Sequence, residues 1–291
     1  MKKTRLAVLT PDPADPTYGA RITPPTAHYV ALFERFGIEA FAHPWTEGPP
    51  RDAAGALAGL VWGYHFRLDA FEALMSAWPA SLPLINPPNV LLWNARKTYL
   101  QALGAAGVSI IPTLTPKVCD AAFLQGAFDA LDADELVVKP LVSAGSHQTF
   151  RVRRDDDLAE KLTGSPPHGR MIQPFLNAVA GEGELSAFFF DGVFSHAVRK
   201  QAADGDFRVQ PQFGARLSAM QPTDDMLAVA RSALAAAPDG LLYARIDMVR
   251  DAAGVLRLME LEAIEPDLYF EFAPDAGDAF GRAVLNRLGI G

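Results

Sequence analysis

Four charged residues near the C-terminus have the types and the spacing to bind a metal ion beside a phosphate. They are Arg245, Asp247, Glu260 and Glu262, in two stretches joined by the turn-forming segment 251–254. Because side chains alternate along a strand, the first two share a face, and so do the last two on the adjoining strand. Converging carboxylates repel one another unless a cation is present, and Mg²⁺ takes such hard oxygen ligands in nucleotide sites.

The apolar residues between these positions, Ile246, Met248, Met259 and Leu261, are expected to point to the opposite face. A solvated sheet face with surface ion pairs would give the same sequence pattern. This stretch alone therefore leaves both interpretations open.

A lysine at the end of an apolar run is the second feature. Lys139 ends the run in residues 135–139, where its charge is costly unless an anion accompanies it. The small-residue loop 143–146 follows, and such a loop can bring backbone N–H groups close to an anion. This combination favours phosphate binding, although the GxxxxGK[ST] string of a P-loop occurs nowhere in the chain. A lysine that snorkels to the surface before an ordinary turn is the alternative.

Other cations, one acidic residue and a proline-broken segment could contribute to the same site. They are Lys97, Lys200, Arg199, Arg208, Glu184 and the Gln-Pro-Phe-Leu segment 173–176. Each lysine taken alone is also explained as a solvated surface residue. The segment has the composition of a linker or a hinge.

The elements that must position these residues differ between the two halves of the chain. In the first half, apolar runs predict strands at 6–9, 38–42, 60–62 and 84–87, and helical spacing predicts helices at 27–36 and 71–78. This alternation predicts a parallel α/β lobe of about ninety residues, with a boundary at Pro87, Pro88 and Asn89.

The second half predicts an α+β fold with antiparallel strands. We expect a helix at 90–103, a strand at 136–139, hairpin strands at 188–190 and 193–200, a helix at 224–236, and hairpin strands at 243–249 and 255–262. The pair Asp191 and Gly192 can supply the positive φ angles of a type I′ turn in the first hairpin.

The composition is that of a globular protein and excludes several classes of function. The 291 residues are 49% hydrophobic and 21% charged, with a net charge of -8 and no basic block, so we expect no nucleic-acid partner. Cys119 is the only cysteine, which leaves no internal disulfide, and we expect it to be a buried bystander. No apolar run reaches membrane-spanning or signal-peptide length, so we expect a cytoplasmic protein.

Taken in order, the motifs resemble the ATP-grasp superfamily, and within it the glutathione-synthetase-like and RimK-like carboxylate–amine ligases. The matching strings are WNARKTYL (93–100), VVKP (137–140), SAGS (143–146), IQPF (172–175), GELS (183–186), HAVRK (196–200), DFRVQ (206–210), ARIDMV (244–249) and MELE (259–262). The resemblance covers residues 94–271 and rests on the order and spacing of the strings.

The resemblance implies an α/β N-terminal lobe followed by an α+β ATP-grasp fold of two lobes that clasp the nucleotide. The implied domains are an N-terminal pre-ATP-grasp domain at 1–90, a central lobe at 91–174 and a C-terminal lobe at 175–291. The first domain fits the family more loosely than the other two.

The resemblance also implies a role for each matching residue. Lys97 and Lys139 match lysines that hold ATP phosphates, and Ser143, Ala144, Gly145 and Ser146 match the flap over them. Gln173, Pro174, Phe175 and Leu176 match the segment whose backbone reads adenine, and Glu184 matches the carboxylate that holds the ribose. Asp247, Glu260 and Glu262 match magnesium ligands, and Arg245 matches the arginine that stabilises the transferred phosphoryl group. Lys200 and Arg208 are phosphate or acyl-phosphate contacts.

This chain departs from many members of the family at one metal position. Those members carry asparagine where this chain has Glu262, so the site holds an extra negative charge. The number of metal ions therefore stays open. The expected cofactors are ATP and Mg²⁺, which Mn²⁺ could replace.

The implied reaction activates a carboxylate for attack by an amine. A carboxylate oxygen attacks the γ-phosphate of ATP to give an acyl phosphate and ADP, and an amine then displaces phosphate. Phosphoryl transfer needs positioning and charge neutralisation more than a covalent nucleophile. The partners are small-molecule carboxylate and amine substrates, and a homodimer is an open option. Relatives include peptide-forming ligases and one that closes a small amino-acid ring, so the ligation could be intermolecular or ring-closing.

The N-terminal lobe offers the candidate substrate contacts. They are Arg21, His28, Trp62, Tyr64, His65 and Arg67. An arginine among them could hold a carboxylate in bidentate fashion, although a surface or core position is the simpler explanation of each residue.

Two functions from other classes compete with a ligase. A glycosidase could use Glu260 and Glu262 as paired carboxylates, but it leaves Lys97 and Lys139 without a role. A nucleotide-binding regulator that has lost ligase activity is the second, and the intact metal ligands beside Arg245 argue against it. Measured ATP turnover would separate the regulator from the enzyme.

Overall fold

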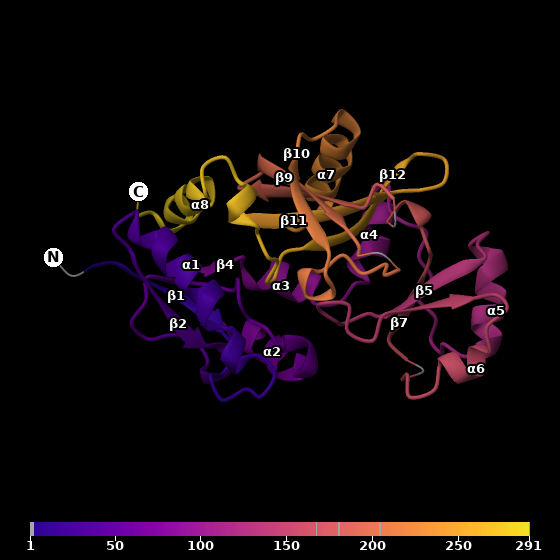
Figure 1. The fold of residues 1–291 in the computed structure, drawn as a ribbon. Coiled ribbons are helices and arrows are strands. Elements are labelled where there is room, and N and C mark those ends of the chain that lie inside the picture. The colour runs from indigo at the N-terminus through magenta and orange to yellow at the C-terminus, as the bar shows by residue number, and fades with distance from the viewer. Residues whose placement is uncertain (1–2, 167, 180, 204, 291) are drawn as a thin grey trace.

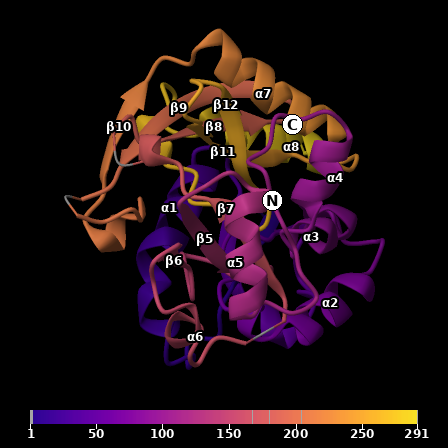
Figure 2. The ribbon, with the colours of Figure 1, turned by 90° about the vertical axis from the view of Figure 1, so that its right-hand side faces the viewer.

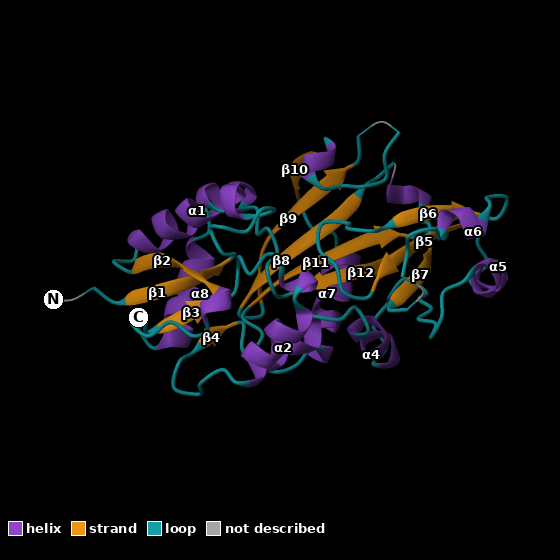
Figure 3. Cartoon of the chain, turned by 90° about the horizontal axis from the view of Figure 1, so that it is seen from below, coloured by secondary structure: helices purple, strands orange, loops and turns teal. Residues whose placement is uncertain are grey.

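The computed structural model describes residues 3–166, 168–179, 181–203 and 205–290, and within these ranges the chain forms three β-sheets (Figure 1). The sheets follow one another along the molecule, with the N-terminal sheet at one end and the smallest sheet at the other (Figure 3). No helix in these ranges has both the length and the apolar content that a membrane crossing needs.

The N-terminal lobe is a parallel sheet in the order β2-β1-β3-β4, with helices packed on it. Its strands are β1 (Arg5–Thr10), β2 (Glu39–Pro44), β3 (Gly55–Leu57) and β4 (Leu84–Ile85), and its helices are α1 (Thr23–Glu34) and α2 (Leu68–Ser76). Five of the six residues of β1 are buried, as expected for a strand covered on both faces. The predicted α/β class of this lobe is confirmed.

The strand predicted at 60–62 is wrong. The third strand is β3, and residues 59–60 and 62–63 form turns that lead into a short helical turn. Residues 55–61 are all buried, so burial continues beyond the end of the strand. No alternation of apolar and polar residues marks in the sequence where the strand ends. Gly63 has a φ of 85°, a left-handed conformation that turns the chain at this point.

The helix predicted at 90–103 is two helices, α3 (Pro88–Asn94) and α4 (Tyr99–Ala105). The break contains Lys97, whose backbone N–H donates to the carbonyl of Leu141 at 2.7 Å. The break thus ties the start of the second half of the chain to the segment after β5 (Glu135–Pro140).

The central sheet is antiparallel, in the order β6-β5-β7, and α5 covers it (Figure 2). Besides β5, its elements are β6 (Phe150–Arg153), β7 (Arg170–Pro174), α5 (Ala121–Ala130) and α6 (Leu158–Lys161). Cys119 is buried in the core of this lobe, as predicted. Gln173 and Pro174 belong to the end of β7, so the connection to the next lobe begins at Phe175.

The C-terminal sheet is antiparallel, in the order β10-β9-β8-β11-β12. Its elements are β8 (Glu184–Phe190), β9 (Val193–Gln201), β10 (Arg216–Met220), β11 (Tyr243–Arg250), β12 (Leu256–Glu262), α7 (Asp224–Ala236) and α8 (Asp278–Leu288). Both predicted hairpins and the helix at 224–236 are confirmed. Asp191 and Gly192 have φ values of 48° and 76°, as the expected turn requires.

Both faces of the C-terminal sheet are covered. Leu185 and Phe189 of β8 share a core with α7 and α4, whereas Phe188 and Phe190 share a core with α8 and the N-terminal lobe. The buried apolar residues of 90–108 pack in the first of these cores or, for Leu91 and Ala95, in a core of the N-terminal lobe, rather than in the core of the central lobe. The domain limits at 90 and 174 stay predictions.

Candidate active site

A cavity of about 1030 Å³ opens where the three lobes meet. Its lining includes loops of the N-terminal lobe, the loop after β5, the connection after β7 and the charged residues of the C-terminal sheet. All the residues predicted for the site line it: Lys97, Lys139, Ser143, Ala144, Gly145, Ser146, Gln173, Pro174, Phe175, Leu176, Glu184, Lys200, Arg208, Arg245, Asp247, Glu260 and Glu262. The fold thus brings together segments far apart in sequence, while the role of each residue stays a prediction.

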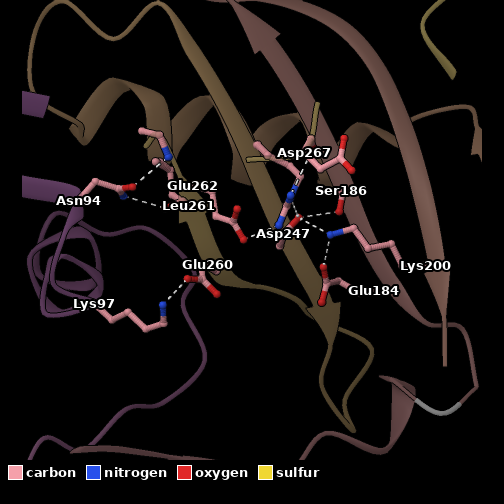
Figure 4. A network of polar contacts seen from close by, with 12 residues as sticks. Asn94, Lys97, Glu184, Ser186, Lys200, Asp247, Glu260, Leu261, Glu262 and Asp267 are labelled. Carbon is pink, nitrogen blue, oxygen red and sulfur yellow. Dashed lines mark hydrogen bonds and ion pairs between the residues drawn. The ribbon is translucent and has the colours of Figure 1, made fainter. Parts of the chain in front are cut away.

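The pairing register of the C-terminal sheet gathers the charged groups on one face. Asp247 lies opposite Glu260, and Arg245 lies opposite Glu262, across the β11–β12 pair. Residues opposed in this way have side chains about 5 Å apart, within direct reach of one another. On the other side of β11, Ser186 of β8 lies opposite Asp247. Figure 4 shows the resulting polar network.

The sheet alternation fails at Met259, which was expected on the apolar face and instead lines the cavity. The register shifts after Asp247, because Met248 pairs with Leu258 while Asp247 pairs with Glu260. A bulge of this kind inserts an extra residue and re-aims a side chain. Met259 thereby joins Ile111 and Val137 as an apolar part of the cavity lining.

Asp247 is the most heavily bonded carboxylate of the site. It accepts hydrogen bonds from Ser186 Oγ at 2.6 Å, from Lys200 Nζ at 3.2 Å and from Arg245 Nε at 3.0 Å. Burial acts to raise its pKa, but Arg245 and Lys200 outweigh burial and lower the pKa below the usual range. Asp247 is therefore ionised throughout the neutral range.

Glu184 and Lys200 form a buried ion pair, with 2.6 Å between the Lys200 Nζ and a carboxylate oxygen. Burial raises the pKa of Glu184, and the nearby Lys200 opposes that rise. The predicted role of Glu184 in holding a ribose stays a prediction, and in this structure its carboxylate is engaged by Lys200.

Lys97 connects β12 to the flap. Its Nζ lies 2.6 Å from Glu260 Oε1 and donates to the carbonyl of Ser143 at 3.0 Å. Burial acts to lower the pKa of Lys97, but the Glu260 carboxylate reverses the effect and the pKa is raised. Within the flap, Gly145 and Ser146 have φ values of 59° and 61°.

Lys139 and Glu262 have pKa values that lie near neutrality. Burial lowers the pKa of Lys139 to about 8, and no hydrogen bond or ion pair joins its ammonium to a described residue. Burial raises the pKa of Glu262 to about 7, assisted by Glu260 and opposed by Arg245, to which it is hydrogen-bonded. Both groups would change charge readily when an ion enters the cavity.

The donor set fits a hard divalent cation, although the described residues hold no preformed cluster of three ligands. The carboxylates instead contact the cations of the protein. In Glu260 and Glu262 those contacts use one oxygen each, so the second oxygen is available, and both residues line the cavity. Oxygen ligands of this kind suit Mg²⁺ or Mn²⁺.

Arg208 contacts residues of its own loop, whereas Lys97, Lys200 and Arg245 contact carboxylates of the C-terminal sheet. It pairs with Asp206 at 2.7 Å and stacks on Phe213 at 3.7 Å, in the loop between β9 and β10. The connection after β7 is held by a cation–π contact, because the Arg151 guanidinium lies 3.5 Å from the centre of the Phe175 ring.

The N-terminal lobe supplies five of the six candidate substrate contacts to the cavity. Arg21, His28, Trp62, Tyr64 and His65 line it, and Arg67 is not among the lining residues. Burial lowers the pKa of His65 to about 4, and both of its ring nitrogens are buried without a partner among the described residues.

Sequence reasoning missed Tyr18, His147, Glu265 and Tyr269, which also line the cavity. Burial raises the pKa of Glu265 to about 8, and Glu262 adds to the effect. An available clue was its position, three residues after Glu262 and directly before a proline.

Comparison with known proteins places this site in a family. Residues 114–266 match the model of the ATP-grasp domain of prokaryotic glutathione synthetase. Over 246 residues the chain is 35% identical to the cycloserine biosynthesis protein DcsG of Streptomyces lavendulae. The alignment covers 78% of this chain and 81% of that protein. The chain therefore belongs to the ATP-grasp superfamily, among its glutathione-synthetase-like ligases.

Solved structures agree with this placement. The crystal structure of D-cycloserine synthetase DcsG matches with a TM-score of 0.81 and 30% identity, over 98% of this chain and 99% of that one. D-alanine–D-alanine ligase from Bacillus anthracis has the same fold, with a TM-score of 0.69 and 18% identity over 98% and 96% of the two chains.

The protein is thus an ATP-dependent carboxylate–amine ligase, an enzyme that forms C–N bonds. The alternative of a regulator without ligase activity finds no support among these relatives, and the hydrolase alternative does not agree with the family.

Proposed function

We propose that the enzyme closes a ring within one small amino-acid-like molecule by joining its activated carboxylate to a nitrogen of the same molecule. The observation that carries this proposal is the cavity, in which Lys97 and Lys139 face Arg245 and the carboxylates of β11 and β12. The relative described as D-cycloserine synthetase supports a product of that kind. D-Cycloserine is a five-membered ring that contains an amide C–N bond, which is the bond type that this family forms.

ATP would bind with its phosphates between the central lobe and the C-terminal sheet. Lys97, Lys139 and the N–H groups of the 143–146 flap would hold the phosphates, since cations and backbone donors in a water-poor site bind phosphate strongly. The backbone at Phe175 and Leu176 would bind the adenine edge. Met259 would add an apolar surface beneath the purine ring.

Glu260 and Glu262 would hold Mg²⁺ or Mn²⁺, together with Asp247 once a cation contact of Asp247 is exchanged. When bound, the metal supplies positive charge to the transferring phosphoryl group. Glu262 would ionise fully in its presence, because a cation beside a carboxyl favours the charged form.

The reaction would proceed in two displacements. A substrate carboxylate oxygen bonds to the γ-phosphorus while the bond from that phosphorus to the ADP oxygen breaks, which gives an acyl phosphate. The nitrogen then bonds to the carbonyl carbon, phosphate leaves with the electrons of the C–O bond, and the nitrogen loses a proton. Arg245, which lines the cavity, would stabilise the charge that develops in both displacements.

The test is turnover on serine derivatives that carry a nitrogen on the side-chain oxygen, in D and L forms. We expect ADP, phosphate and a cyclic product in equal amounts from one D-configured substrate, measured by coupled assay and mass spectrometry. Pairs of D-alanine molecules are the control for intermolecular ligation. A dipeptide from the control, with no ring from any derivative, would contradict ring closure.

We also propose that the enzyme works in the cytoplasm on small molecules, because ATP and free amino acids are available together there.

A further inference from the structure

Glu265 occupies a fixed position at the substrate end of the cavity. It lies just beyond β12, and the backbone on both sides of it is held by side chains of the sheet. The carbonyl of Ile264 accepts a hydrogen bond from Tyr243 Oη at 2.6 Å, and that of Asp267 accepts one from Arg245 Nη1 at 3.2 Å. The Glu265 side chain lines the cavity, so it is presented from a preorganised segment.

Glu265 differs from the carboxylates of β11 and β12 that line the cavity, because no ion pair joins it to a described cation. Asp247, Glu260 and Glu262 each form an ion pair with a lysine or an arginine. Among the described residues, no side chain forms a hydrogen bond or an ion pair with the Glu265 carboxylate. Burial without a cation disfavours the charged form of Glu265, whose pKa is raised to about 8, and a cationic ligand would restore the carboxylate.

The surroundings of Glu265 suit an organic ammonium group better than a metal. Tyr18 and Trp62 of the N-terminal lobe line this part of the cavity, with ring centroids 6.0 Å apart. Tyr18 and Tyr64 line the same cavity as Glu265, and burial and the charge of Glu265 both raise the pKa of these phenols, so they stay neutral. Aromatic faces attract ammonium groups through cation–π interactions, whereas Mg²⁺ demands several oxygen ligands.

We propose that Glu265 binds the ammonium group of the amino-acid substrate and makes the enzyme select amino acids over the corresponding hydroxy acids. The proposal rests on the proposed function, because it assumes a small amino-acid substrate in this cavity. Glu265 follows Glu262, the partner of Arg245, by three residues. An amino acid held by its ammonium group therefore keeps its carboxylate near the residues assigned to phosphoryl transfer.

The test compares matched probes that differ only in the amino group. Isothermal titration of the full chain with ADP and Mg²⁺ would measure D-alanine against D-lactate, and D-cycloserine against isoxazolidin-3-one. We expect the wild type to prefer the amino member of at least one pair by about 10- to 100-fold, the range for a hydrogen bond to a charged group. Glu265→Gln should reduce that preference to nearly one, while the affinity for ADP is unchanged.

Two further variants make the result specific. Glu271→Gln removes the same charge from an exposed residue of the cavity lining and should keep the wild-type preference. Glu265→Asp keeps the charge, and should retain part of the preference even if Glu265→Gln folds poorly.

The outcomes separate this proposal from ring closure. Suppose that the wild type prefers D-alanine over D-lactate but does not prefer D-cycloserine over isoxazolidin-3-one. If Glu265→Gln abolishes the preference for D-alanine, ring closure fails and the ammonium site stands. If the wild type prefers neither amino probe, or if Glu265→Gln keeps the preference, the ammonium site is overturned. A variant whose only change is a weaker affinity for Mg²⁺ would make Glu265 a metal ligand instead.

Discussion

At the scale of single residues, the site is a balanced set of buried charges. Lys200 and Arg245 both contact Asp247, and Lys97 contacts Glu260, so the protein's own cations neutralise most of these carboxylates. Ion pairs in a buried site restrain their side chains, but each cation removes negative charge that a metal would otherwise meet. We therefore expect ATP phosphates and the metal ion to bind by replacing some of these ion pairs with contacts of their own.

The first prediction concerns Arg245, whose proposed role is to stabilise charge during transfer. Arg245→Ala should lower kcat by about 10²–10³, the effect of losing one donor to a developing negative charge. The affinity for ADP should change little, because that interaction strengthens only in the transition state. Steady-state kinetics and ADP titration check this. Equal losses in kcat and in ADP affinity would assign Arg245 to ground-state binding.

The second prediction concerns Glu260. Glu260→Gln should abolish magnesium-dependent turnover, because it removes a proposed ligand charge at nearly constant volume. It should also lower the free energy of unfolding by about 1–3 kcal/mol, since Lys97 loses a charged hydrogen-bond partner. Removing one of several converging carboxylates would by itself relieve repulsion, but loss of the ion pair with Lys97 outweighs that gain. Normal turnover in the variant would show that Glu260 is not a ligand.

The third prediction is a pH dependence of nucleotide binding. Burial lowers the pKa of Lys139 to about 8, and a bound phosphate would raise it. Binding therefore takes up a proton above pH 8, so the affinity for ADP is full below pH 8 and falls as the pH rises from 8 to 10. Titration calorimetry across this range measures the fall. Lys139→Arg, which stays charged, should show a smaller fall over the same range, because Glu265, with a pKa of about 8, still titrates in the cavity; an undiminished fall in this variant would contradict the assignment.

At the scale of elements, the sequence predicted those parts of the fold that have local causes. The hairpin at 191–192 was predictable because its turn demands residues that accept positive φ, and the amphipathic helix α7 because one face is apolar. The inward charges of β11 and β12 follow from strand alternation. These parts included most of the candidate site.

The parts that sequence reasoning missed have non-local causes. A buried apolar run hid the end of β3, and the contact of Lys97 with Leu141 broke a helix that local spacing predicted as continuous. The bulge beside Asp247 turned Met259 into the cavity, and only the pairing of two strands reveals it. No local sequence pattern marks Glu265, because its proposed role depends on aromatic residues of another lobe.

The fourth prediction tests how an element positions the site. Gly183 has a φ of 93° directly before β8, and a Cβ there would overlap the carbonyl of Lys200. Gly183→Ala should therefore destabilise the protein by about 2–4 kcal/mol, from the left-handed strain and the overlap together. It should also lower kcat, because it displaces the Glu184–Lys200 pair.

Gly192→Ala is the matched control for Gly183→Ala. Gly192 has a φ of 76°, but nothing lies within 4 Å of an added Cβ, and it is not among the residues that line the cavity. It should lose about 1–2 kcal/mol of stability and keep its kcat. Thermal unfolding and kinetics distinguish the two, and equal kcat values in both variants would show that the turn before β8 does not position the site.

At the scale of the whole molecule, two units with separate cores enclose the cavity. Phe190 of the C-terminal sheet and Phe280 of α8 share a core with Phe33 of the N-terminal lobe, which joins these two lobes into one unit. The helix α8 returns the chain to the N-terminal lobe, where it packs against α1 (Figure 1). The central lobe keeps a core of its own around Phe128. A nucleotide between two such units can be enclosed by a shift of one unit without exposing either core.

This arrangement also explains why the reaction should be phosphoryl transfer rather than adenylation. Lys97, Lys139 and the proposed metal ligands line the cavity together, and Lys97 contacts Glu260 directly, so these charges would gather around the terminal phosphates. Adenylation would need these charges gathered around a pyrophosphate leaving group instead. The central claim is therefore that the substrate carboxylate attacks the γ-phosphate.

The most direct test of that claim follows the carboxylate oxygen. The serine derivative that turns over is labelled with ¹⁸O in its carboxylate, and phosphate, pyrophosphate, ADP and AMP from a single reaction are measured by mass spectrometry. An acyl-phosphate mechanism predicts ADP and phosphate in equal amounts, with one ¹⁸O atom carried into the phosphate. AMP with pyrophosphate, and the ¹⁸O label in AMP, would contradict it.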